Sequence, residues 1–338
     1  MNSGKPTSIT VIIVTYRSAS LTIACLRSLL PERQLPSIEL NAVVVDNASG
    51  DAPEIEAAVQ REGWSNWVTL VVAPRNGGFA YGNNLGFAQA RINRPPEYFH
   101  LLNPDTQIKP GAVHVLAQFL NTHPAAGIAG SSFENQDGSD WPFAFRFPSI
   151  LSELEGGLNW GVVSRLLSHW TVARTMTAKT QQVDWGAGAS MMIRRDLLHR
   201  IGELDENYFL YFEETDFCWR AKRAGAPMWY VPDSRVLHIG GQSTKVTERN
   251  AAPKRLPAYW YESRRRYFMR TGGITRAILI DIVALVANAL GLLKFAVQRR
   301  RNSTVPHYLK DLWHNSVIHR RNRHLAPGPA RGRELSEF

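Results

Sequence analysis

Short apolar runs alternate with amphipathic segments along the first 130 residues of the chain. Runs rich in β-branched residues predict strands buried on both faces, and apolar residues three or four positions apart predict helices. Strands are expected at residues 9–15, 40–45, 67–73, 98–102 and 128–131, and helices at 19–30, 52–61, 85–92 and 110–121. This alternation predicts an α/β fold with a doubly wound, mostly parallel sheet flanked by helices.

The pattern weakens in the middle of the chain and then resumes. Residues 133–180 are rich in Trp, Phe, Gly and Ser, which favours an insertion with short helices. Strands are expected at 183–194 and 228–231, and helices at 197–201 and 214–224. A polar break follows at 240–250. We therefore predict one domain at 1–250, with a first half at 8–131 and a second half at 132–250.

Beyond the break, residues 257–270 predict an Arg-rich and aromatic helix, and 274–298 form a long apolar stretch interrupted by Asp281, Asn288 and Lys294. That stretch is about long enough to cross a bilayer. The flanking arginines are Arg264, Arg265, Arg266 and Arg270 before it and Arg299, Arg300 and Arg301 after it. The orientation of a membrane-spanning helix normally depends on a difference in positive charge between its two ends, and here both ends are positive. We therefore favour a helix held in the membrane interface by these arginines. Packing on the catalytic domain or on a partner subunit is the alternative.

Charge is unevenly distributed along the chain, whose formal net charge is +10. Residues 254–338 hold 17 of the 39 Lys and Arg but only 5 of the 29 Asp and Glu, which leaves 22 basic and 24 acidic residues in the body. A basic C-terminal region favours an anionic partner, such as a membrane surface. Because no nucleic-acid-binding motif accompanies the arginines, we expect no nucleic-acid partner. We assign 251–325 to membrane association or to formation of a homo-oligomer, and 326–338 to a disordered tail.

Cysteines and the first residues indicate the compartment. Cys25 and Cys218 both lie in apolar surroundings, which predicts buried thiols in a reducing environment. Residues 1–8 contain one Lys and no apolar core, so they do not read as a secretory signal. We therefore expect a cytoplasmic protein.

Polar residues follow four of the expected strands, at the edge where ligands bind in open α/β sheets. The candidate donor-binding residues are Thr15, Tyr16, Asp46, Asn76, Gly78, Asn84 and Asn103. Tyr16 would stack near a base, and Asp46 would accept from the base or ribose; core packing and a helix cap are the alternatives. The Gly-rich stretch 76–84 lacks the Lys-Ser/Thr of a P-loop but suits a backbone that approaches a diphosphate.

Two residues are candidate ligands for Mg²⁺ or Mn²⁺. Asp105 follows a predicted strand, and its carboxylate suits a cation that neutralises charge on a departing diphosphate. His238 follows another strand-like run and precedes two glycines. A turn at Asp105 and a structural role for His238 are the alternatives.

Three acids follow the aromatic run 208–212. Glu213 and Glu214 are candidate catalytic residues, because a carboxylate beside apolar groups has a raised pKa and can take a proton near neutral pH. A helix N-terminus decorated with acids is the alternative. Asp216, Trp185 and Gly188 are further candidate site residues. Pairing of Asp216 with Arg220, four residues later, and core packing of Trp185 are the alternatives.

Together these motifs resemble glycosyltransferase family 2, of the inverting GT-A type, and most of all its bacterial rhamnosyltransferase-type members. The matching stretches are 11–16, 43–49, 76–80, 102–105, 186–189, 209–216 and 238–243. The resemblance implies that Asp46 contacts the base, Asp105 is the last acid of the metal motif and Glu214 is the general base. It also implies a catalytic domain at 1–250, with the nucleotide-binding half at 8–131 and the acceptor and catalytic half at 132–250. The acceptor and sugar pocket would contain Trp185, Gly188 and Asp216. Asn103 departs from the usual first acid of the metal motif. Glu214 departs from the usual aspartate, so Glu213 stays a reserve candidate.

The resemblance also implies a function. We expect transfer of a sugar from a nucleoside-diphosphate donor, with L-rhamnose from dTDP-rhamnose favoured, to a hydroxyl of a saccharide or polyprenyl-diphosphate-linked acceptor. The enzyme would act in bacterial surface-polysaccharide synthesis at the inner face of the cell membrane. Galactosyl, mannosyl or N-acetylglucosaminyl transfer, a nucleotidyltransferase and an inactive membrane-associated scaffold are the alternatives. A nucleotidyltransferase would usually carry a Gly-rich loop with Arg and Lys directly after the first strand. Only Arg17 follows that strand here, which disfavours this alternative.

Overall fold

Ten strands form one mixed sheet in the described part of the chain, in the order β3-β2-β1-β4-β11-β6-β12-β5, with β7 beside β6 and β9 beside β12. The computed structural model describes residues 5–92, 95–135, 138–141, 144–239, 253–298 and 305–324. The strands of this sheet are β1 (Thr7–Thr15), β2 (Ile38–Asp46), β3 (Val68–Val72), β4 (Tyr98–Leu102), β5 (Thr106–Ile108), β6 (Ile128–Glu134), β7 (Asp140–Trp141), β9 (Gln181–Val183), β11 (Ser190–Arg194) and β12 (Met228–His238). A separate pair is formed by β8 (Ala144–Phe145) and β10 (Trp185–Gly186).

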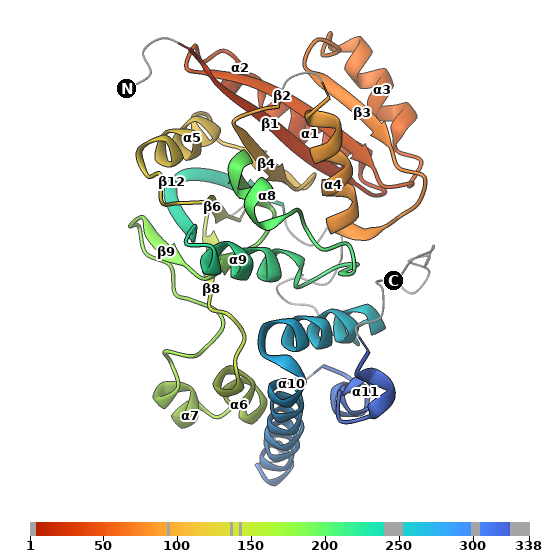
Figure 1. Cartoon of the computed structure of the whole chain (residues 1–338), viewed down its shortest axis with the longest axis vertical. Coiled ribbons are helices and arrows are strands. Elements are labelled where there is room, and N and C mark those ends of the chain that lie inside the picture. Colours follow the sequence, from red (N-terminus) through yellow and green to blue (C-terminus); the bar gives the residue numbers. More distant parts are fainter. Residues whose placement is uncertain are drawn as a thin grey trace.

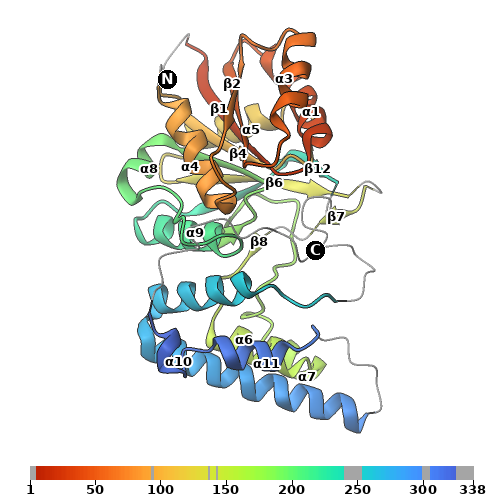
Figure 2. The same cartoon turned by 90° about the vertical axis from the view of Figure 1, so that its right-hand side faces the viewer.

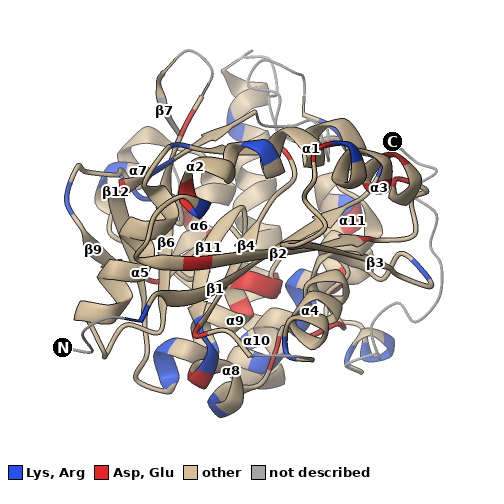
Figure 3. Cartoon of the chain, turned by 90° about the horizontal axis from the view of Figure 1, so that it is seen from above, with Lys and Arg blue, Asp and Glu red and all other residues tan. Residues whose placement is uncertain are grey.

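Helices cover the sheet and form a separate layer below it (Figure 1). They are α1 (Ala19–Ser28), α2 (Leu30–Arg33), α3 (Ala52–Arg61), α4 (Gly78–Ala90), α5 (Ala112–Thr122), α6 (Ile150–Leu158), α7 (Gly161–Leu166), α8 (Arg195–Ile201), α9 (Glu213–Arg223), α10 (Ala258–Val297), α11 (Tyr308–Asn315) and the 3-10 turn η1 (Arg320–Asn322). In the N-terminal half, α1 and α3 lie on one side of the sheet and α4 on the other (Figure 3). The predicted mostly parallel, doubly wound α/β sheet is confirmed in this half.

The β-branched runs form the buried centre of the sheet. β1 pairs in parallel with β2 and β4, and β2 pairs in parallel with β3. Ile9, Ile12 and Val44 have no exposed surface, as expected of strands covered on both faces. β11 runs antiparallel between β4 and β6, so the sheet changes direction next to its central strands.

The single strand predicted at 183–194 is wrong. The segment contains the end of β9 and all of β10 and β11, which pair with β12, with β8, and with β4 and β6, respectively. Asp184 separates the first two: its carboxylate accepts the backbone N–H of Phe147 at 3.0 Å. The small residues 187–189 then make a loop before β11. β12 is longer than predicted, since it continues to His238 past an irregularity between Val231 and Arg235.

The helix predicted at 85–92 begins earlier, at Gly78, so most of the Gly-rich stretch is helical and not a loop. The reason is close packing on β1. A Cβ at Gly82 would lie 2.6 Å from the Val14 side chain, and one at Gly86 would lie 2.4 Å from Ile12. Glycine weakens a helix in isolation, but here it lets the helix approach the sheet.

The layer below the sheet is built from α6, α7, α10 and α11 (Figure 2). The predicted short helices within 133–180 and the two helical stretches near the C-terminus are confirmed. Gly273, with φ 72° and ψ 175°, interrupts α10 and divides it into two halves. The first half lies between the catalytic body and the second half, which forms the far end of the molecule.

The arginines before the apolar stretch have partners within the protein. Arg264 is 2% exposed and pairs with Asp281 at 2.5 Å and with Glu153 at 2.8 Å. Arg266 and Arg270 both pair with Asp205. The remaining one, Arg265, donates to the backbone carbonyl of Asn315 at 3.1 Å. The arginines predicted after the stretch, the polar break at 240–250 and the tail at 326–338 lie outside the described residues.

Candidate active site

The polar ends of β1, β2 and β3 lie side by side, because Thr15 is in register with Asp46 and Asp46 with Val72. The buried carboxylate of Asp46 accepts the backbone N–H and hydroxyl of Ser49 at 2.8 and 2.6 Å, and the N–H of Ala52 at 3.0 Å. Asp46 therefore holds the turn after β2 and the first residue of α3, whereas Asp51 is the N-cap residue of that helix. Tyr16 is half-buried at the end of β1, with the Arg17 guanidinium 5.2 Å from its ring centroid.

Asp51 organises the same edge, and our sequence analysis missed it. Its Oδ2 accepts the Thr15 hydroxyl at 2.8 Å and the Ser18 N–H at 2.7 Å. Thr15 has no exposed surface, so its hydroxyl is used to join β1 to the turn after β2. The position of an aspartate just before a predicted helix was the available signal.

Asn47, also missed, fixes the Gly-rich turn. Its side-chain N–H donates to the Asn76 oxygen at 2.9 Å, and its oxygen accepts the Gly77 N–H at 3.3 Å. The Asn76 oxygen also accepts the Gly78 N–H at 3.1 Å. Gly78 has φ +87°, and a Cβ there would lie 1.9 Å from the Phe209 carbonyl oxygen. The close approach that this glycine allows is thus to the segment before the acid pair.

Asn84 lies within α4, where its side-chain N–H donates to the Leu204 carbonyl at 2.9 Å and to Glu206 at 3.0 Å. The structure therefore contradicts our assignment of Asn84 to the donor site. The residue holds the segment that leads to the aromatic run.

The two candidate metal ligands come together from different strands. His238 Nε2 lies 3.5 Å from Asp105 Oδ1, although 133 positions separate them in the sequence. The backbone contributes to this contact, since the Ile239 N–H donates to the Asp105 carbonyl at 2.9 Å. Asp105 is 1% exposed, and the His238 ring packs 5.6 Å from that of Phe133.

This donor set fits a divalent cation that carries a substrate. One carboxylate and one imidazole leave most coordination positions of Mg²⁺ or Mn²⁺ to phosphate oxygens and water. No group of three or more His, Cys, Asp or Glu suited to a metal occurs among the described residues. The site therefore suits an ion held jointly with a diphosphate better than a closed structural metal.

Glu213 and Glu214 begin α9. Burial, with a further contribution from the charge of Glu214, raises the pKa of Glu213 well above its ordinary value. Burial also raises the pKa of Glu214, against hydrogen bonds from its own backbone N–H, from Gly188 and from Glu213. The contact between the two carboxyl groups thus favours the proton on Glu213 and the charge on Glu214. Oε2 of each has no hydrogen-bond donor in the part of the chain that the structure describes.

A strained turn places the acid pair. Tyr211 and Phe212 both have positive φ, 69° and 68°, which bulky L residues rarely adopt. Such strain persists only where the surroundings impose it. Here the first half of α10 does so, since the Ser263 hydroxyl donates to the Leu210 carbonyl at 3.0 Å and Tyr259 stacks on Tyr211 with ring centroids 6.2 Å apart.

Asp216 is not part of an open site, so its assignment to the acceptor pocket is wrong. The side chain has no exposed surface, and it pairs with Arg220 at 2.8 Å, which is the alternative drawn from their spacing. Tyr208 donates a long hydrogen bond of 3.4 Å to it. Trp185 also has protein partners: its indole N–H donates to the Arg146 carbonyl at 2.9 Å, and its ring stacks on Phe145 at 4.4 Å.

The loop between β10 and β11 joins the metal candidates to the acid pair. The Asn103 N–H donates to the Ala189 carbonyl at 3.0 Å, next to Asp105 in the chain. The neighbouring Gly188 N–H points to Glu214 Oε1 at 3.5 Å, and a Cβ at Gly188 would lie 2.8 Å from the Phe79 ring. Four motifs that are far apart in the sequence therefore meet at this loop.

Comparisons with known proteins agree with this arrangement. A family model described as "Glycosyltransferase like family 2" matches residues 6–255. The N-acetylglucosaminyl-diphospho-decaprenol L-rhamnosyltransferase of Mycobacterium tuberculosis is 28% identical over 248 residues, which cover 69% of this chain and 76% of that protein. The rhamnosyltransferase WbbL of Escherichia coli K12 is 26% identical over 166 residues, 48% of this chain and 60% of that protein.

Among solved structures, the mannosyltransferase PcManGT from Pyrobaculum calidifontis, in complex with GDP-Man and Mn²⁺, superposes with a TM-score of 0.52 at 17% identity. The match covers 88% of this chain and 76% of that one. At this identity the similarity is one of fold, and it confirms the GT-A-like architecture.

Proposed function

The chain belongs to the glycosyltransferase-like family 2, and we propose that it is an inverting enzyme that transfers L-rhamnose from dTDP-rhamnose to a hydroxyl of a saccharide acceptor carried on a polyprenyl diphosphate. The rhamnosyltransferase names of its relatives support the sugar, and the decaprenol-linked substrate in the name of the mycobacterial relative supports the acceptor. The observation that carries the chemistry is the contact of the acid pair with the loop that holds Asn103, beside Asp105.

Glu214 is the proposed general base. It takes the proton of the acceptor hydroxyl as that oxygen bonds to the anomeric carbon, and the bond from this carbon to the diphosphate oxygen breaks with its electron pair on the diphosphate. Attack from the side opposite the leaving group inverts the configuration. Oε2 of Glu214, buried and without a hydrogen-bond donor among the described residues, is the proposed proton acceptor, and protonated Glu213 keeps the second charge out of the buried site.

Asp105 and His238 would hold Mg²⁺ or Mn²⁺ together with the donor diphosphate. When bound, such an ion stabilises the negative charge of the departing diphosphate. Tyr16, half-buried at the end of β1, is the proposed platform for the base. Asp46 shapes the same edge through its turn, and its contact with the base is proposed from the resemblance alone.

We further propose that the enzyme works at the cytoplasmic face of a bacterial membrane in surface-polysaccharide synthesis. A polyprenyl-linked acceptor lies in that membrane, so the catalytic body has to approach it. Residues 1–250 would form the catalytic domain and 251–325 the membrane-association region, and α6 and α7 from the first range lie with α10 and α11 in the layer below the sheet (Figure 1).

Glu214→Gln tests the base directly. The variant should lose transfer by roughly 10²–10⁴-fold, the usual contribution of a positioned proton acceptor, and keep its affinity for the nucleotide sugar. Glu56→Gln, the same change at an exposed position on α3, is the matched control and should be unaffected. Unchanged turnover in Glu214→Gln would remove this residue from the mechanism.

A thermal-shift screen tests donor and metal. The full chain would be heated with dTDP-rhamnose, UDP-galactose, GDP-mannose or UDP-N-acetylglucosamine, each with Mn²⁺, Mg²⁺ or EDTA. A ligand that binds the folded state raises the melting temperature, so dTDP-rhamnose with a divalent ion should give the largest shift. A larger shift with another nucleotide sugar would reassign the donor. His238→Ala should raise the metal concentration needed for the donor to shift the melting temperature. His199→Ala, at an exposed position on α8, should not change it.

A further inference from the structure

The second half of α10 carries an apolar face on the side that points away from the protein. From residue 277 to residue 297, every exposed side chain is aliphatic: Leu279, Ile282, Val286, Ala289, Leu290, Leu293, Ala296 and Val297. The exposed fractions of the six larger ones run from 43% at Ile282 to 75% at Val297. Their spacing of three or four residues places these six on one stripe. A stripe of this kind marks a surface that meets another apolar phase or another protein.

The opposite face of the same helix is fixed to the protein. A Cβ at Gly291 would lie 2.4 Å from the Gly157 carbonyl oxygen, so α10 and α6 are in backbone contact. Lys294 donates to the Leu158 carbonyl at 3.0 Å. Asp281, on the buried side, accepts the Val317 N–H at 2.8 Å. The one helix that is long and apolar enough to span a membrane, among the described residues, thus has only one side available to lipid.

That asymmetry argues against a spanning helix. A helix that crosses a bilayer is surrounded by hydrocarbon, and polar groups on its neighbours would then lie in lipid. Here α6 and α11 pack on α10, and α6 brings polar groups with it: Glu153, which pairs with Arg264, and the Leu158 carbonyl, which accepts from Lys294. A helix that lies in the plane of the interface buries only its outer face, which matches the observed division.

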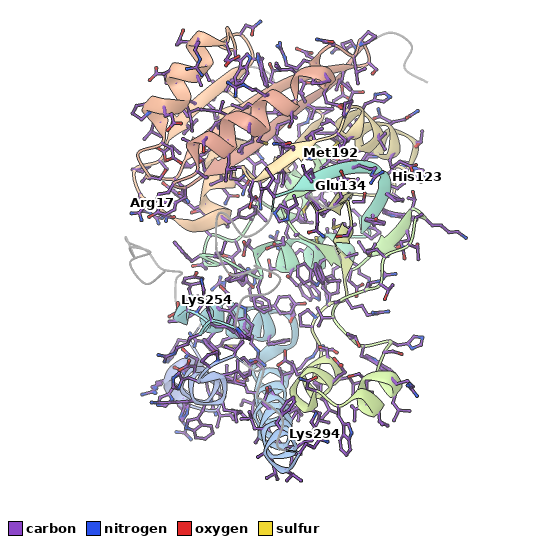
Figure 4. The ribbon with its side chains drawn as sticks, turned by 180° about the vertical axis from the view of Figure 1, so that it is seen from behind. Arg17, His123, Glu134, Met192, Lys254 and Lys294 are labelled. Atoms are coloured by element: carbon purple, nitrogen blue, oxygen red, sulfur yellow. The ribbon has the colours of Figure 1, made fainter. Side chains whose placement is uncertain are left out.

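The neighbouring α7 extends the apolar surface. Trp160, Val162, Leu166 and Trp170 are 53%, 64%, 73% and 44% exposed. They follow directly on Asn159, whose carbonyl accepts a hydrogen bond from Lys294. Figure 4 shows Lys294 on the second half of α10 at the lower end of the molecule. The exposed faces of α7 and α10 therefore belong to the same end of the protein.

Charge around this end favours an anionic partner. The described residues 294–298 and 305–324 contain five Lys and Arg and a single acid, Asp311. Asp311 pairs with Arg255 at 2.7 Å, which neutralises it. Lys310, Arg320 and Arg321 are exposed, and the ring of Trp313, 46% exposed, lies among them in the sequence. Basic residues and tryptophan beside an aliphatic stripe are the composition of interfacial helices on anionic lipid.

We propose that the outer stripe of α10, from Leu279 to Val297, lies flat in the headgroup region of an anionic lipid bilayer, with α7 beside it. This inference rests on the proposed function, because the stripe would be the surface by which the enzyme meets a lipid-linked acceptor. In this proposal the aliphatic stripe is the part of the protein that contacts lipid. The arginines at 264, 265, 266 and 270 have partners within the protein instead.

Flotation of the full chain with vesicles tests the proposal. The protein should float with phosphatidylcholine vesicles containing 30% phosphatidylglycerol, and less with phosphatidylcholine alone. Leu290→Glu with Leu293→Glu should lower the bound fraction on the order of tenfold or more, because two charges would enter the interface. Ile92→Glu, at a 67% exposed position on the other part of the molecule, is the matched control and should bind as the wild type does.

A label gives a second measurement that does not depend on the folding of the charged variant. Cys25 and Cys218 have no exposed surface, so a cysteine at position 290 can be labelled selectively with an environment-sensitive fluorophore. Leu290→Cys should shift its emission to the blue on anionic vesicles, and Ile92→Cys should not.

Three results would overturn the proposal. They are failure of the wild type to bind anionic vesicles, resistance of the bound chain to alkaline extraction as for a spanning helix, and a lipid-free dimer that Leu290→Glu with Leu293→Glu converts to monomer. Transfer to a short, soluble acceptor analogue separates this proposal from the enzymatic one. The charged variant should keep that transfer, whereas vesicle binding without any transfer by the wild type would refute the proposed function alone.

Discussion

Gly78→Ala tests how the Gly-rich turn and the acid pair are joined. Gly78 has φ +87°, and an alanine Cβ there would lie 1.9 Å from the carbonyl oxygen of Phe209. The same oxygen accepts the N–H of Phe79 at 3.0 Å. Phe209 precedes Glu213 by four residues, so a displacement of its carbonyl displaces the strained turn that places the acids.

Two contributions set the expected loss of stability in Gly78→Ala. A side chain in the left-handed region costs roughly 1–2 kcal/mol. The contact at 1.9 Å then forces the backbone apart and sacrifices the Phe79–Phe209 hydrogen bond, which contributes about 0.5–1.5 kcal/mol. We expect Gly78→Ala to lower the free energy of unfolding by about 2–4 kcal/mol. Gly63→Ala is the matched control, since Gly63 has φ +70° and no heavy atom within 4 Å of its Cβ position.

Denaturant unfolding followed by tryptophan fluorescence would measure both variants beside their transfer kinetics. Gly63→Ala should lose only the first contribution and keep its kcat. Gly78→Ala should lose more stability, and its kcat should fall on the order of a hundredfold, as for a small misplacement of a catalytic group. Equal stability losses with normal turnover in both variants would refute the proposed coupling between turn and acid pair.

Three further predictions follow from buried contacts. Because the pKa of Glu213 is raised on folding, the folded state holds its proton above the ordinary carboxyl pKa near 4.5, and the free energy of unfolding should fall as pH rises from there to the raised value. Glu213→Gln should flatten this fall and be more stable than the wild type at pH 8, by about 1.4 kcal/mol per unit of raised pKa; urea unfolding at pH 5 and pH 8 would test it, and a parallel pH dependence would contradict it. Asp281→Ala should cost roughly 3–5 kcal/mol in urea unfolding because it breaks a buried pair with Arg264, and a loss below 1 kcal/mol would show that Glu153 compensates. Ser263→Ala should lower kcat with little change in the KM for the donor, whereas Thr271→Ala, whose hydroxyl bonds to Tyr267 in its own helix, should leave both unchanged.

Much of the catalytic half could be predicted because its signals are local. The runs around Ile12 and Val44 are too apolar for a strand with one wet face, so they indicated a sheet covered on both sides. Polar residues at the carboxyl ends of parallel strands share an edge by geometry alone. For that reason the approach of Asp105 and His238 could be anticipated without any knowledge of the loops between them.

What could not be predicted depends on partners that are distant in the sequence. The helical state of the Gly-rich stretch follows from the fit of Gly82 and Gly86 against β1, and no local propensity indicates that fit. Arg266 reads as a free positive charge until the fold brings it to Asp205, 61 positions away. Asn84 likewise reads as a ligand contact until Leu204 and Glu206 are placed beside it.

The two halves of α10 join the proposed membrane surface to the proposed base. The first half holds the turn before Glu213 through Ser263, and the second half carries the apolar stripe. Gly273 separates the halves, yet the buried pair between Arg264 and Asp281 connects them across that kink. Opening the kink would separate this buried pair, leaving Arg264 with Glu153 and Asp281 with its hydrogen bonds from Ser316 and Val317, so the pair favours the observed angle. If the stripe lies on the bilayer, the height of the acid pair above the lipid is therefore set by this one helix, and an acceptor has to present its hydroxyl at that height.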